Sequence, residues 1–128
     1  ARDVFGAQAQ AMEGIDAVLC ANDAMALGVL DVLESAGARS KPLIVGINAV
    51  PEAVAEISAG RMLATASFDA MAMCSLATEA ALRHLRGEAV PGEIVLPVDV
   101  VDAHNCAVWN VPFEKRTLPI WEQATAGA

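Results

Sequence analysis

The chain of 128 residues is long enough for one domain of ordinary size with its own hydrophobic core. Hydrophobic residues make up 55% of it and charged residues 19%, which excludes the low-hydrophobicity, high-charge composition of disordered segments. The net charge of −8 leaves little basic surface for phosphate groups, so no nucleic-acid partner is expected.

Targeting and metal-binding signals are weak. No apolar run approaches the ~20 residues that a transmembrane helix needs. The opening stretch "ARDVFGAQAQAMEG" lacks the apolar core of a signal peptide. Cys20, Cys74 and Cys106 form no CxxC pair and have no histidine at metal spacing, so we expect buried thiols, with neither metal nor cofactor.

The first predicted unit is a strand followed by a helix. The apolar run 17–20 is too short for a helix and reads as a strand, and residues 24–36 carry apolar side chains at helical spacing. Asn22 or Asp23 would serve as the N-cap of this helix, and Gly37 would end it.

Two further strand and helix pairs follow, and a fourth strand comes after them. Pro97 interrupts this last strand, which favours an edge position or a bulge. Alternating strands and helices predict an α/β fold, a parallel sheet with helices on both faces. The tail 105–128 changes composition and is expected to be an irregular strap packed on the body. The predicted strands are 41–48, 62–68 and 92–102, and the predicted helices are 50–60 and 70–86.

Polar residues stand at the ends of three predicted strands: Asn22 with Asp23, Asn48, and Phe68 with Asp69. In open parallel sheets, ligands bind at the carboxyl ends of the strands. Carboxamides both donate and accept hydrogen bonds, which suits polyhydroxyl ligands, and an aromatic ring offers a flat apolar surface to a sugar. The alternative is structural: Asn and Asp are common caps and turn residues, and phenylalanine is common in cores.

Evidence for catalysis is thin. Cys20 precedes a predicted helix but has no identified base, and the sequence contains neither a nucleophile elbow nor a phosphate-binding glycine loop. An α/β enzyme that uses Cys20 or a carboxylate is therefore a minor hypothesis, and the chain is expected not to be an enzyme.

From about Ile15 to Asn105 the sequence resembles the C-terminal part of type I periplasmic sugar-binding proteins, the ribose-binding-like receptors of ABC importers. The similar segments are "IDAVLCANDAMALGVLDVLESAG", "LIVGINAVPEAVAEISAGRMLATASF", a long helix that ends in "LRGE", and "LPVDVV" followed by "AHN". "ANDAMALG" is shared with lactose-repressor-type regulators, so an effector-binding domain of such a regulator is the alternative.

The resemblance implies a role for three of the candidate residues. Asn22 matches the asparagine of the family's "xND" motif, which hydrogen-bonds sugar hydroxyls. Asn48 stands in place of the usual aspartate of "VGFD", and Phe68 stands where many members have glutamine, so the ligand could be another sugar or polyol. From its position at a strand end, Asp69 completes the candidate ligand-binding set, and from its position at the helix start Asp23 is assigned as the helix cap, with ligand contact as its alternative role.

The resemblance also implies an incomplete fold of about one lobe. Residues 1–104 would form the C-terminal portion of the sugar-binding fold, with helix 70–86 belonging to the other lobe, and 105–128 would be the strap. A missing N-terminal lobe or another chain would complete the cleft. The implied partners are a sugar or polyol and a membrane ABC permease, reached by hinge closure, and the implied location is the periplasm.

Overall fold

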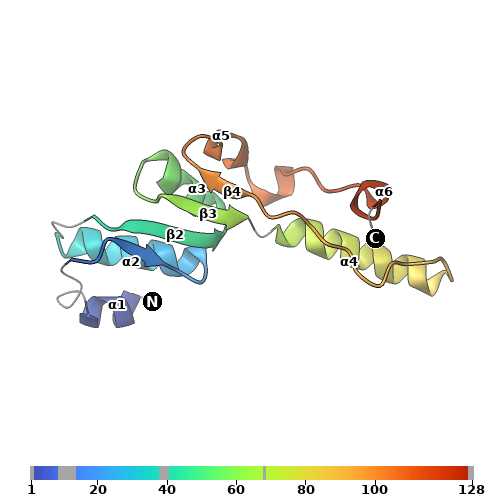
Figure 1. Ribbon diagram of the computed structural model, residues 1–128, viewed down its shortest axis with the longest axis horizontal. Coiled ribbons are helices and arrows are strands. Elements are labelled where there is room, and N and C mark those ends of the chain that lie inside the picture. Colours follow the sequence, from blue (N-terminus) through green and yellow to red (C-terminus); the bar gives the residue numbers. More distant parts are fainter. Residues whose placement is uncertain (1, 9–13, 38–40, 68, 127–128) are drawn as a thin grey trace.

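The computed structural model describes residues 2–8, 14–37, 41–67 and 69–126 of the chain. Its centre is a four-stranded sheet in the order β1-β2-β3-β4 (Figure 1). The strands are β1 (Ala17–Leu19), β2 (Leu43–Asn48), β3 (Ala64–Ser67) and β4 (Val100–Asp102). The helices are α1 (Arg2–Gln8), α2 (Asp23–Ser35), α3 (Pro51–Ser58), α4 (Ala70–Leu85), α5 (Cys106–Trp109), α6 (Trp121–Ala124) and the short 3-10 helix η2 (Phe113–Lys115).

Strands β1, β2 and β3 are parallel, and α2 and α3 connect them, as the alternating pattern predicts. Strand β4 departs from the expected parallel sheet, because it pairs antiparallel with β3. After β3 the chain leaves the sheet through α4 and returns beside that helix, so it enters the sheet from the opposite end. Only 100–102 of the predicted strand 92–102 pairs, since residues 91–96 lie against α4 and Pro97 has no N–H to donate.

The hydrophobic core lies between one face of the sheet and the helices α2 and α3. The strand register places Gly46, Thr65 and Val101 side by side on this face. The buried residues that α2 and α3 contribute to this core are Ala26, Val29, Leu30, Ala53, Val54 and Ile57.

The opposite face of the sheet is apolar and uncovered by the described helices. Leu19 is 82% exposed and Val100 is 62% exposed, and Leu43 and Ile47 are also exposed on this face. The sequence predicted helices on both faces of the sheet, and the described helices cover one of them.

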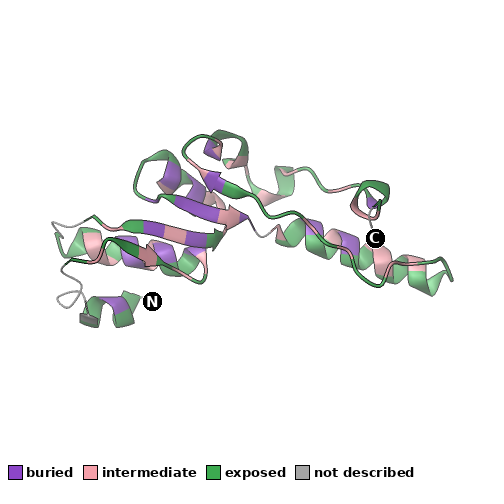
Figure 2. Cartoon of the chain, in the orientation of Figure 1, coloured by how far each residue is buried: buried purple, intermediate pink, exposed green. Residues whose placement is uncertain are grey.

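The molecule is elongated, because α4 extends away from the sheet body and the tail follows it (Figure 1). Buried residues concentrate in the sheet, α2 and α3, whereas α4 is exposed along much of its surface (Figure 2). Where the chain leaves and re-enters the body, Ser67 and Asp99 exchange two hydrogen bonds, of 2.7 Å from the Ser67 N–H and 2.9 Å to the Ser67 Oγ. None of the helices described is both long enough and apolar enough to cross a bilayer.

Candidate functional site

The candidate residues Asn22, Asn48 and Asp69 lie at one edge of the sheet, where the parallel strands β1, β2 and β3 end. Asn48 is the last residue of β2 and pairs in register with Ser67, the last residue of β3. All three candidate side chains are partly exposed, so a ligand at this edge could reach them. Phe68, the remaining candidate, lies outside the described residues.

Asn22 is the N-cap of α2. Its backbone is extended, with φ −158° and ψ 168°, and its Oδ1 accepts a 2.9 Å hydrogen bond from the Met25 N–H. The prediction that Asp23 is the cap is therefore wrong, because the cap is one residue earlier. The cap uses Oδ1, and the Asn22 carboxamide nitrogen carries two N–H donors that can face a ligand.

Asp23 is the first residue of α2 and is fully buried. Its carboxylate accepts hydrogen bonds from Thr65 Oγ1 at 2.7 Å and from the Val50 N–H at 2.9 Å. Burial raises the pKa of Asp23, while the hydrogen bonds from Thr65 and Val50 oppose that rise. Because no part of Asp23 is exposed, it connects α2, β3 and the loop after β2 and does not present a surface to a ligand.

Gly46 provides the space that the Asp23 carboxylate occupies. A Cβ at this position would lie 2.2 Å from Asp23 Oδ1 and 3.2 Å from the Asp23 Cα. Glycine in the middle of a strand often marks a close approach of another group to the backbone, so the glycine of "VGIN" could have predicted this contact. The sequence analysis did not identify Thr65 either, because nothing in its sequence context "ATAS" indicates that its hydroxyl donates to Asp23.

Asn48 and Ala49 adopt unusual backbone conformations at the end of β2, with φ 121° and φ 51° respectively. Non-glycine residues with positive φ are uncommon and occur preferentially at functional sites. The Ala49 N–H donates to Thr65 Oγ1 at 3.3 Å. The turn that carries the Asn48 side chain is thus attached to the same buried threonine as Asp23.

Asp69 is the N-cap of α4, and its Oδ1 accepts a 2.9 Å hydrogen bond from the Ala72 N–H. Its negative charge also acts on Arg116, where it opposes the lowering of the guanidinium pKa that burial causes. Sequence reasoning did not identify Arg116, which donates from Nη2 to the Ala49 carbonyl at 2.7 Å. No local pattern could have found it, because 67 residues separate Arg116 from Ala49.

Cys20, the candidate nucleophile of the enzyme hypothesis, has the wrong electrostatic environment for that role. Burial raises the pKa of its thiol, and the nearby charge of Asp23 raises it further. An activated cysteine needs the opposite shift, toward the thiolate. The expectation of buried thiols is wrong for Cys74, which is exposed on α4, whereas Cys106 is buried and Cys20 is half-buried. Within the described part of the chain, no three His, Cys, Asp or Glu side chains gather as they would around a metal ion.

Comparison with known proteins gives consistent matches. The family model described as a periplasmic binding protein domain matches residues 1–89. A Rhizobium meliloti protein named for rhizopine binding is 34% identical over 93 residues, which are 72% of this chain and 30% of that protein. The D-allose-binding periplasmic protein of Escherichia coli K12 is 43% identical over 65 residues, which are 51% of this chain and 21% of that protein.

A solved structure agrees with these sequence matches. An ABC transporter solute-binding protein from Bacillus halodurans with bound myo-inositol superposes with a TM-score of 0.79 at 27% identity, over 85% of this chain and 38% of that one. The expected α/β fold of the type I periplasmic binding proteins, present in part, is thereby confirmed. The chain spans less than two fifths of the length of each of these relatives. It belongs to the family of the periplasmic binding protein domain.

Proposed function

We propose that this chain supplies one side of the cleft of a periplasmic solute-binding protein, and that the ligand is a monosaccharide or polyol. The observation that carries the proposal is that Asn22, Asn48 and Asp69 all stand at the carboxyl ends of the parallel strands β1, β2 and β3, with Asn48 held at positive φ. Carboxamide and carboxylate groups suit a neutral polyhydroxyl ligand. The relatives named for D-allose binding and bound to myo-inositol support the same ligand class.

In this role no bond is made or broken. Ligand binding between two lobes would stabilise the closed form, which a membrane ABC permease would recognise in the periplasm. The second function considered, an effector-binding domain of a lactose-repressor-type regulator, is not favoured, because the relatives described above are periplasmic and transporter proteins.

We further propose that α4 belongs to the second lobe, which the chain enters after β3 and leaves again through 94–101. The apolar residues Met71, Met73, Leu82 and Leu85 of α4 are exposed. Polypeptide outside the described residues would cover them, since an exposed apolar surface of this kind normally meets a partner.

Asn48→Ala tests the site. The experiment uses the natural polypeptide, meaning this chain with any further residues that its gene encodes, and measures binding of D-allose and myo-inositol by calorimetry. Loss of a buried hydrogen bond to the ligand should weaken the affinity by about 1 to 3 kcal/mol. Asn110→Ala is the matched control, because Asn110 is exposed and lies in the tail between α5 and η2. Unchanged affinity in Asn48→Ala would remove Asn48 from the site.

A further inference from the structure

The turn after β2 needs external support. Asn48 has φ 121° and Ala49 has φ 51°, and such conformations are strained for non-glycine residues. They persist only where surrounding groups fix them. The turn matters for function because, under the proposed function, it directs the Asn48 carboxamide toward the ligand.

Two of the supporting groups belong to the core beneath the site. Thr65 Oγ1 accepts from the Ala49 N–H at 3.3 Å, and Asp23 accepts from the Val50 N–H at 2.9 Å. Both bonds hold the N–H side of the turn. The carbonyl side needs a donor, and this donor comes from a different part of the chain.

Arg116 supplies that donor from the C-terminal tail. Its Nη2 donates to the Ala49 carbonyl at 2.7 Å and to the Trp109 carbonyl at 3.2 Å. Helix α5, which contains Trp109, packs against α3, the helix that follows the turn. Arg116 therefore connects the C-terminal tail to the backbone of Ala49, the residue that follows Asn48.

The guanidinium of Arg116 is held in a fixed orientation. Its carbon lies 4.5 Å from the Phe113 ring centre and 5.3 Å from the Trp109 ring centre, which is cation–π geometry. Within the described residues, its Nε and Nη1 are buried without a hydrogen-bond partner. Arg116 as a whole is half-buried, and its two hydrogen bonds go to backbone carbonyls of this chain, so we infer that its influence on binding passes through Ala49 and Asn48.

We propose that Arg116 is a positioning residue of the ligand site, which holds the Asn48–Ala49 turn in its binding conformation from the C-terminal tail. The role rests on the proposed function. The family model ends at residue 89, so this support lies beyond the part of the chain that the family model describes. Because Asp23 and Thr65 remain in place, loss of Arg116 should affect binding more than folding.

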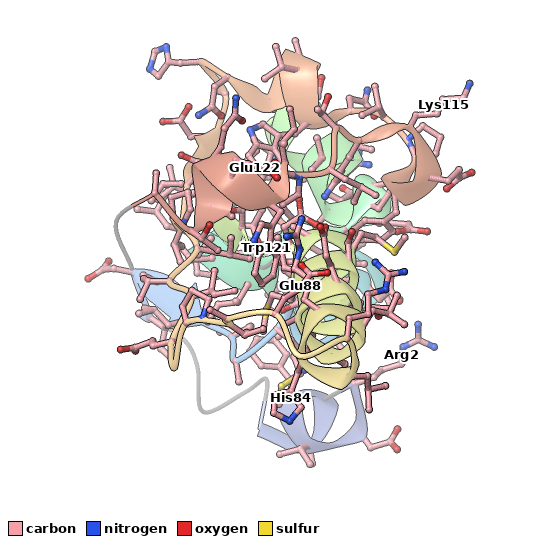
Figure 3. The ribbon with its side chains drawn as sticks, turned by 90° about the vertical axis from the view of Figure 1, so that its right-hand side faces the viewer. Arg2, His84, Glu88, Lys115, Trp121 and Glu122 are labelled. Carbon is pink, nitrogen blue, oxygen red and sulfur yellow. The ribbon has the colours of Figure 1, made fainter. Side chains whose placement is uncertain are left out.

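The test compares Arg116→Met, Arg116→Lys and the control Lys115→Met in the natural polypeptide. Lys115 is exposed and its side chain points away from the body (Figure 3). The first readout is NMR of the ligand-free protein, with φ-dependent couplings and Cα shifts at Asn48 and Ala49. The second is affinity for D-allose and myo-inositol, and the third is the unfolding midpoint.

In Arg116→Met we expect the φ-dependent signals of Asn48 and Ala49 to move and the affinity to fall about tenfold, by loss of a charge-assisted hydrogen bond. Arg116→Lys should keep part of the wild-type NMR signals and part of the affinity, because an ammonium can still donate to the Ala49 carbonyl. Lys115→Met should change neither the NMR signals nor the affinity. Unmoved NMR signals in Arg116→Met, or moved signals with full affinity, would overturn the proposal.

The experiment stays informative if the wild type does not bind either probe or if Arg116→Met does not fold. Failure of the wild type to bind either probe would contradict the proposed function for those ligands, while the ligand-free NMR would still test the positioning of the turn. If Arg116→Met does not fold, the same NMR measurement on Arg116→Lys replaces it. Wild-type NMR signals at Asn48 and Ala49 together with a lowered ligand affinity in Arg116→Lys would refute the positioning role.

Discussion

Asn22 and Asp23 are neighbours in the sequence and have different functions in the structure. Asn22 accepts the Met25 N–H and caps α2, whereas Asp23 is buried and accepts hydrogen bonds from Thr65 and Val50. The sequence predicted both a cap and a second role at this pair but assigned the cap to the wrong residue. A one-residue shift changes which side chain faces the helix N-terminus, and a pattern of apolar spacing does not resolve that shift.

Asn22→Ser separates the two functions of the Asn22 carboxamide. Serine keeps an oxygen that can cap α2 but removes the nitrogen donor, so the free energy of unfolding should stay within about 0.5 kcal/mol of wild type. Ligand affinity should fall by about 1 to 2 kcal/mol. Asn22→Ala, the comparison variant, should also lose about 1 kcal/mol of stability. Denaturant unfolding and calorimetry check both values, and full affinity in Asn22→Ser would exclude the carboxamide from ligand contact.

At the scale of elements, the contact between β2 and α2 determines how the helix sits on the sheet. Gly46 lets α2 approach closely enough for Asp23 to reach Thr65 on β3 and Val50 after β2. The helix start is thereby connected to the two strand ends that carry the candidate site.

Gly46→Ala should destabilise the protein, because the new Cβ would lie 2.2 Å from Asp23 Oδ1. Overpacking of this kind costs typically about 1 to 3 kcal/mol in the free energy of unfolding. Gly92→Ala is the control, since nothing lies within 4 Å of a Cβ at that position. Equal unfolding free energies for the two variants in denaturant titration would contradict the close contact.

At the scale of the whole molecule, the tail connects the sheet body to α4. Near the body it is held by Arg116, and at its end Trp121 is buried, with the Arg83 guanidinium 4.7 Å from its ring centre. Glu122 lies next to Trp121 on α6 (Figure 3). Its carboxylate is 3.5 Å from the Arg83 guanidinium. In its described residues, 105–126, the predicted irregular strap contains three short helical segments, and it spans from the sheet to α4.

Asp23 should make the free energy of unfolding smaller as the pH rises, which is the opposite of the usual effect of a carboxylate with a lowered pKa. Burial raises its pKa above the ordinary value of 3.8, so the folded state holds this proton more tightly than the unfolded state. The contribution is therefore fully present below pH 3.8 and is lost as the pH rises through the folded pKa.

Asp23→Asn removes this titration. The difference in unfolding free energy, wild type minus Asp23→Asn, should decrease as the pH rises from 3.8. Thermal or denaturant unfolding at several pH values measures it, with Asp3→Asn on the exposed surface of α1 as the control for loss of one negative charge. A difference that is flat or grows with pH would contradict the raised pKa.

The sequence by itself determined the α/β class, the order of its main elements and the edge at which the polar residues gather. These features follow from local information: apolar spacing, Pro51 at the start of α3, and the position of Asn22 and Asn48 directly after apolar runs. Only the tertiary structure decided the direction of β4, the burial of Asp23 and the contact of Arg116 with the Ala49 carbonyl. These depend on groups brought together from distant parts of the chain, and the physical reason is that a buried hydrogen bond is set by three-dimensional proximity, which spacing along the sequence does not encode.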